Sequence, residues 1–132
     1  MDMTLPEPLK KSIERKLTQH CDEKVPENVR NLSRLKFFIS GNTVILYEER
    51  PSVAFPSRWV EIYVAQFRYS TKTEKWTLYW AEENYKWHVY PECNPKKEFD
   101  DLLIEVDKDP TGIFGGVEND TDKHFPENRN RK

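Results

Sequence analysis

The segment that decides the fold reads RLKFFISGNTVILYEER and covers residues 34–50. Apolar residues alternate with other residues on both sides of Gly41-Asn42, as in two half-buried strands joined by a two-residue loop. The tightest pairing across this loop brings Arg34 opposite Glu49, which is a favourable cross-strand charge pair. The same register gathers one apolar set on a single face: Leu35, Phe37, Ile39, Val44 and Leu46. The segment therefore predicts an antiparallel hairpin with one buried face.

Three more strand-like runs follow the hairpin, over residues 60–69, 76–81 and 86–90. Short polar turns connect these runs, and short connections make neighbouring strands antiparallel. The chain therefore predicts a five-stranded antiparallel meander.

The pairing of these strands assigns their side chains to two faces. We predict that Tyr69 lies opposite Trp76 and that Trp80 lies opposite Trp87. The predicted core face then carries Ala65, Phe67, Tyr69, Trp76, Leu78, Trp80, Trp87 and Val89. The opposite face carries Gln66, Arg68, Thr77, Tyr79, His88 and Tyr90.

One amphipathic helix is predicted before the sheet region in the sequence, and a second is predicted after it. Pro6 and Pro8 suit the start of the first helix, and Pro26 ends it. Asn94 is a suitable N-cap for the second helix, with Pro95 as its first residue. The apolar stripes are Leu9, Ile13, Leu17 and Cys21 in the first helix, and Phe99, Leu102, Leu103 and Val106 in the second.

These elements define the fold class as α+β. We expect a five-stranded antiparallel meander sheet with the N-terminal and the C-terminal helix packed on its apolar face. Residues 1–116 are expected to form a single domain, because the chain is too short for two ordinary ones. Residues 117–132 are polar and charged, and we expect them to form a disordered tail.

Composition excludes several classes of protein. The 132 residues contain 21 Lys and Arg against 23 Asp and Glu, so bulk positive charge cannot drive nucleic-acid binding. Cys21 and Cys93 are too few for a disulfide scaffold. No apolar run is long enough to span a membrane, and no secretory leader is recognisable. We expect a cytoplasmic protein without membrane contact.

Several spaced motifs resemble the bacterial family known as domain of unknown function 3024. The strand motifs are residues 65–69 (AQFRY), 76–80 (WTLYW) and 87–90 (WHVY). The other motifs are Val25-Pro26, Gly41-Asn42, residues 46–51 (LYEERP) and residues 109–114 (DPTGIF). The resemblance covers residues 12–116, and one departure is visible at Gly115, where the family usually has Trp. The resemblance implies a bacterial, cytoplasmic, single-domain protein and brings no known activity.

The polar sheet face carries the candidate binding site. Its residues are Arg68, Tyr79, His88, Tyr90 and Gln66, with Lys36, Phe38 and Tyr47 extending the surface across the hairpin. Tyr and Arg side chains are the usual anchors of protein interfaces, so a partner protein is the first interpretation. Single-stranded nucleic acid is the alternative, because aromatic residues stack bases. A solvated face without a partner also explains the pattern, since Tyr and Thr favour strands.

An enzyme is a further alternative, with His88 as the general base. Tyr79 or a carboxylate would orient the imidazole, and Arg68 would hold an anion. No nucleophile elbow, phosphate-binding loop or spaced pair of carboxylates accompanies it, so we expect no cofactor and no chemistry.

Two acidic segments contain side chains that can bind a metal ion. Residues 20–23 (HCDE) lie at a helix end, where consecutive side chains diverge. Residues 107–112 (DKDPTG) with Glu118 match the spacing of a calcium loop, but Pro110 and the lack of an exiting helix favour an ordinary turn. We expect no metal.

The loop over residues 51–59 carries two large apolar side chains, Phe55 and Trp59. They either cap the edge of the core or form an exposed patch that favours a homodimer or partner docking.

Overall fold

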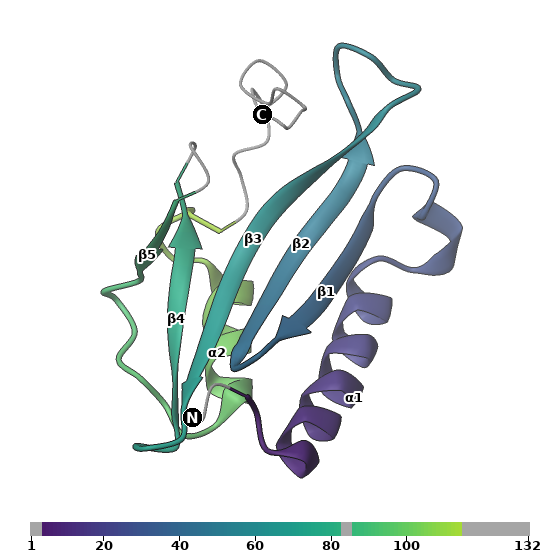
Figure 1. Ribbon diagram of the computed structural model, residues 1–132. Helices are drawn as coiled ribbons and strands as arrows, with labels where there is room; N and C mark the ends of the chain where they lie inside the picture. The colour runs from purple at the N-terminus through teal and green to yellow at the C-terminus, as the bar shows by residue number, and fades with distance from the viewer. Residues whose placement is uncertain (1–3, 83–85, 115–132) are drawn as a thin grey trace.

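The computed structural model describes residues 4–82 and 86–114 of the chain. The elements are α1 (Glu7–Lys24), the short 3-10 helix η1 (Glu27–Val29), β1 (Arg34–Ser40), β2 (Thr43–Pro51), β3 (Trp59–Ser70), β4 (Lys75–Ala81), β5 (Trp87–Val89) and α2 (Phe99–Lys108). The strands form one antiparallel sheet in the order β1-β2-β3-β4-β5 (Figure 1). The predicted α+β class, with a meander between two helices, is confirmed.

Both helices contribute to one hydrophobic core on one face of the sheet, which we call the helix face. In Figure 1, α2 lies behind the sheet and α1 runs along β1. The buried side chains of this core are Ile13, Leu17 and Cys21 of α1, Val44, Leu46, Ala65, Phe67, Trp76 and Leu78 of the sheet, Phe99, Leu102, Leu103 and Val106 of α2, and Leu5, Tyr90 and Phe114 outside these elements. Neither α1 nor α2 lies on the opposite face, which we call the outer face.

The first hairpin has the predicted register. Arg34 pairs with Glu49 and Ser40 pairs with Thr43. Gly41 has a φ of +62°, the left-handed conformation that a Gly-first two-residue loop requires. This hairpin follows from local sequence alone because alternation and turn chemistry agree.

The predicted register between the last two strands is wrong by one residue. Trp80 pairs with His88 and not with Trp87. The backbone N–H of Glu82 donates to the carbonyl of Lys86 at 2.8 Å, so three residues and not two separate the paired ends. A slip of one residue turns every β5 side chain to the other face of the sheet.

This slip moves Tyr90 from the outer face into the core. Tyr90 is 1% exposed, and its ring packs 4.8 Å from the ring of Phe114. Val89 points outward and is 54% exposed, which corrects its predicted core position, and Trp87 also lies on the outer face. Burying the Tyr90 ring removes more apolar area from water than burying Val89 would.

A β-bulge interrupts the pairing of β2 with β3. Leu46 pairs with Ala65, but Tyr47 pairs with Tyr63, so Val64 is the extra residue. A bulge of this kind changes which side chains of a strand face each side. Beyond it, Tyr63 lies on the outer face, whereas Val64 packs against the core.

The second helix begins later than predicted. α2 starts at Phe99 with Glu98 as N-cap, so the predicted start at residues 94–95 is wrong. Lys96 instead forms an antiparallel bridge with Trp76 through two backbone hydrogen bonds of 2.7 and 3.0 Å. This bridge holds the segment extended beside β4, so the helix forms only after it.

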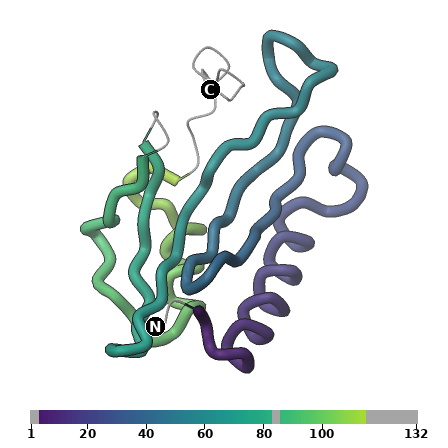
Figure 2. Tube along the Cα trace, in the orientation of Figure 1, coloured from purple at the N-terminus to yellow at the C-terminus, as the bar shows by residue number. Residues whose placement is uncertain are grey.

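The loop between β2 and β3 extends beyond both helices (Figure 2). Phe55 in this loop is 59% exposed, with the guanidinium of Arg58 5.3 Å from its ring centroid. Trp59 is half-buried at the start of β3, under the guanidinium of Arg34. Phe55 therefore does not cap the core.

No helix within residues 4–82 and 86–114 combines the length and apolar character needed to cross a membrane. The predicted tail over residues 117–132 lies outside the described residues.

Tyr90 supplies a test of the core. Its buried hydroxyl has no hydrogen-bond partner among the described residues. We expect Tyr90→Phe to raise the free energy of unfolding by about 1 kcal/mol, because an unpaired polar group leaves the core while the ring remains. Tyr90→Ala should lower it by about 3–5 kcal/mol. Urea unfolding measures both, and a destabilised Tyr90→Phe would contradict the unpaired hydroxyl.

Candidate functional site

The outer face carries a group of aromatic and apolar side chains that reaches across all five strands and encloses one Gln and one Arg. We call this group the outer patch. Its members are Phe38, Ile45, Tyr47, Tyr63, Gln66, Arg68, Tyr79, Trp87 and Val89. Phe38 and Val89, at the two ends, are 44% and 54% exposed. The two ends of the patch and Arg68 are therefore open to solvent, whereas the other rings of the patch are half-buried.

Arg68 lies flat on the sheet at the centre of the patch. Its guanidinium carbon is 4.2 Å from the ring centroid of Tyr79, a cation–π contact. Its Nε donates a 2.6 Å hydrogen bond to Oε1 of Gln66, and Gln66 is only 4% exposed. These two contacts fix the orientation of the guanidinium before any ligand arrives.

Aromatic pairs flank this centre on both sides. Phe38 and Tyr47 meet edge to face, with ring centroids 5.9 Å apart. Tyr63 of β3 and Trp87 of β5 approach to 5.2 Å, although β4 lies between their strands. Ala81 of β4, which pairs with Trp87, has a side chain too small to separate the two rings.

Charged side chains lie at one end of the outer face. Lys36 Nζ lies 3.3 Å from Oε1 of Glu49. In the register of β2 and β3, the residue opposite Glu49 is Glu61. Burial raises the pKa of Tyr47, and the carboxylates of Glu61 and Glu49 raise it further. The Tyr47 phenol therefore stays protonated as a hydrogen-bond donor.

Six of the eight predicted site residues share the outer face: Arg68, Tyr79, Gln66, Lys36, Phe38 and Tyr47. His88 and Tyr90 do not, because of the slip in β5. Sequence reasoning missed Ile45, Tyr63, Trp87 and Val89 as patch members. Tyr63 lies on the outer face because of the bulge, and the alternation of residues in the sequence does not reveal a bulge.

The structure separates the groups of the predicted enzyme. His88 stacks on Trp80 at 5.0 Å, and its Nε2 lies 2.6 Å from Oε1 of Glu82. The predicted carboxylate partner is therefore present, but Arg68 and Tyr79 lie on the opposite face. Arg68 therefore cannot hold an anion beside His88, as the predicted enzyme requires.

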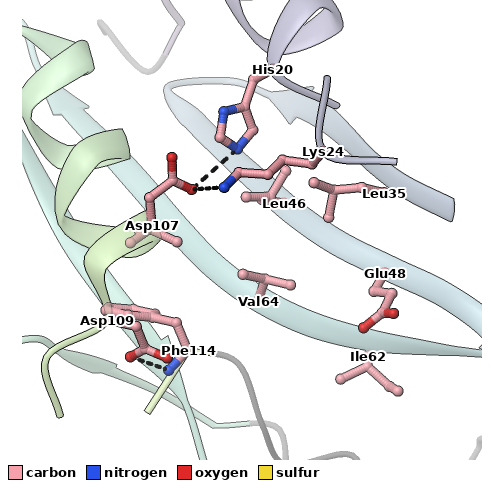
Figure 3. Close-up of a pocket in the computed structure, with 11 residues that line it drawn as sticks. His20, Lys24, Leu35, Leu46, Glu48, Ile62, Val64, Asp107, Asp109 and Phe114 are labelled. Carbon is pink, nitrogen blue, oxygen red and sulfur yellow. Dashed lines mark hydrogen bonds and ion pairs between the residues drawn. The ribbon is translucent and has the colours of Figure 1, made fainter. Parts of the chain in front are cut away.

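A second polar cluster joins the two helices on the helix face (Figure 3). Asp107 Oδ1 of α2 lies 3.3 Å from Lys24 Nζ and 3.6 Å from His20 Nε2, both of α1. Burial lowers the pKa of His20, although the Asp107 carboxylate acts in the opposite direction. His20 is therefore held mainly in its neutral form at neutral pH.

The candidate calcium residues serve other contacts. Asp107 pairs with α1, and Asp109 Oδ1 accepts the backbone N–H of Phe114 at 3.1 Å. Asp109 ends α2 in a left-handed conformation, which supports the turn interpretation. Among the described residues no three His, Cys, Asp or Glu side chains gather as metal ligands, and Glu118 lies outside them.

The two cysteines are free thiols. Burial in the core raises the pKa of Cys21 to about 11, with a smaller contribution from Asp22, so this thiol is unreactive at neutral pH.

Residues 5–116 match the model of the family described as domain of unknown function (DUF3024). The chain belongs to this family. The match confirms the resemblance of the strand motifs and covers every described element of the fold. No curated protein and no solved structure matches the chain. DUF3024 membership assigns no activity, so a functional proposal for this domain depends on its geometry.

His20 should make stability depend on pH. Its pKa is 6.5 in the unfolded chain and lower in the folded one, so the unfolded state binds more protons in this range. The stabilisation is complete above pH 6.5 and is lost as the pH falls through the lowered folded pKa. We expect His20→Gln to flatten the loss of unfolding free energy between about pH 7 and pH 5.

Urea unfolding across this pH range provides the measurement. His88→Gln is the matched control, because the exposed His88 should leave the His20 contribution intact. An unchanged pH dependence in His20→Gln would contradict the assignment.

Proposed function

We propose that this domain is a non-catalytic binding module and that its outer patch docks a partner protein. The observation that carries the proposal is the Arg68 guanidinium, held flat on Tyr79 by the buried Gln66 amid half-buried aromatic residues. Tyr, Trp and Arg supply most of the energy of protein interfaces. Their fixed orientation reduces the entropy that binding would cost.

The chemistry of the patch defines the partner surface that fits it. Arg68 has five N–H donors, of which Nε–H is bonded to Gln66. Its remaining donors suit a carboxylate of the partner, and the rings around it suit a flat apolar surface. The fitting partner therefore presents an apolar face with an acidic residue near its centre.

Single-stranded nucleic acid is the alternative for the same face, since exposed rings stack bases. On this face the carboxylates of Glu49 and Glu61 offset the positive charge of Lys36 and Arg68, so the face lacks the strongly basic groove that follows a phosphate backbone. A partner protein is therefore the better fit. A second copy of this chain is one form that such a partner can take.

The test is an affinity capture from lysate that compares three baits. They are the wild type, an Arg68→Ala/Tyr79→Ala variant and an Arg58→Ala/Phe55→Ala control. The control removes a similar exposed cation–aromatic pair from the β2–β3 loop and leaves the outer patch intact. We expect one discrete protein to be retained by the wild type and the control and to be lost by the patch variant.

The contradicting outcomes are equally specific. Equal retention by all three baits would contradict a docking role for the patch. Bound nucleic acid that washes off as salt rises would favour the alternative. The exposed cation–π contact that each variant loses is worth about 1 kcal/mol of stability. The patch variant also leaves the buried Oε1 of Gln66 without its donor, at a further cost of about 1–3 kcal/mol. Urea unfolding of each bait therefore has to show that the variant is folded before a loss of binding is assigned to the patch.

A further inference from the structure

The helix face contains a cavity of about 270 Å³ between the C-terminal ends of α1 and α2. We call it the helix-face cleft. Leu35, Leu46, Ile62 and Val64 of the sheet line it, together with Val106 and Phe114. Small-molecule sites combine an apolar lining of this kind with a few polar groups, and the volume suits a ligand smaller than a drug.

The bulge in β3 shapes this cleft. Val64 is the extra residue of β3. Ile62, two residues earlier in the chain, also lies on the helix face, opposite Glu48 of β2. In Figure 3, Val64 lies between the Asp107 cluster and Glu48, with Leu46 above it. The cleft therefore has an apolar floor with a charged group at each end.

The carboxylates at the two ends of the cleft differ in whether a cation pairs with them. At one end, the Asp107 carboxylate is paired with Lys24 at 3.3 Å. At the other end, Glu48 accepts a 2.7 Å hydrogen bond from the neutral hydroxyl of Ser33. Among the described residues, no Lys, Arg or His forms an ion pair with Glu48.

The whole cleft favours a cation over an anion. Its lining contains three carboxylates, those of Glu48, Asp107 and Asp109, against the single ammonium of Lys24. His20 adds little positive charge, because burial lowers its pKa. The last turns of both helices border the cleft, and helix C-terminal ends carry partial negative charge.

We propose that the helix-face cleft binds a small organic ammonium compound. Its hydrocarbon body would lie on the floor formed by Leu46, Ile62 and Val64, and its ammonium group would pair with the Glu48 carboxylate. An organic anion would meet three carboxylates and a lysine that is already paired. The cleft lies on the face opposite the outer patch, so this site does not depend on the proposed docking function.

The test uses three probes with the same six-carbon body: hexylammonium, hexanol and hexanoate. Backbone amide NMR spectra of the full chain are recorded during titration with each probe at neutral pH. We expect hexylammonium to give saturable shifts at Glu48, Val64 and Phe114 at millimolar concentrations. Hexanoate and hexanol should bind at least tenfold more weakly.

Two variants separate the charge of Glu48 from general electrostatics. Glu48→Gln keeps the shape of the side chain and should weaken hexylammonium binding at least tenfold. Glu61→Gln removes the same charge from the outer face of the neighbouring strand and should leave binding unchanged. The probe comparison on the wild type needs no variant, so it stands even if Glu48→Gln fails to fold.

The proposal is overturned if hexylammonium produces no saturable shift, or if hexanol or hexanoate binds as tightly. It is also overturned if a folded Glu48→Gln variant binds hexylammonium like the wild type.

Discussion

The extra residue in β3 determines what both faces of the sheet present. Without the bulge at Val64, strict alternation would turn Tyr63 toward the helices and Ile62 toward solvent. With it, the Tyr63 ring meets Trp87 in the outer patch, while Ile62 and Val64 line the helix-face cleft. One added residue therefore completes an aromatic surface on one side and an apolar floor on the other.

The two faces differ in physical character. On the outer face, Arg68 keeps donors available above an aromatic patch that reaches across the strands. On the helix face, the Asp107 cluster joins α1 to α2 and leaves the Glu48 carboxylate without an ion-pair partner among the described residues. Membership of the DUF3024 family assigns a role to neither face. The two proposals rest on separate contacts and can fail separately.

The sequence predicted the fold class, the first hairpin and the β3–β4 register, because alternation and turn chemistry act over a few residues there. It did not predict the slip of β5, since burial of Tyr90 against Phe114 depends on a segment beyond the strand. The start of α2 was missed because the bridge between Lys96 and Trp76 is a tertiary contact. The bulge has no periodic signal at all. The predicted residues around Arg68 and Tyr79 therefore share one face of the sheet, whereas His88 and Tyr90, at or after β5, lie on the other.

Photo-crosslinking in living cells tests the docking role of the outer patch most directly. A photoreactive phenylalanine analogue would replace Val89 in the patch or, as a matched control, Ile104 on α2. The two side chains are similarly exposed, at 54% and 50%, but lie on opposite sides of the molecule. The account predicts a discrete crosslinked protein from position 89 and none from position 104. No crosslink from position 89, or the same products from both positions, would contradict it.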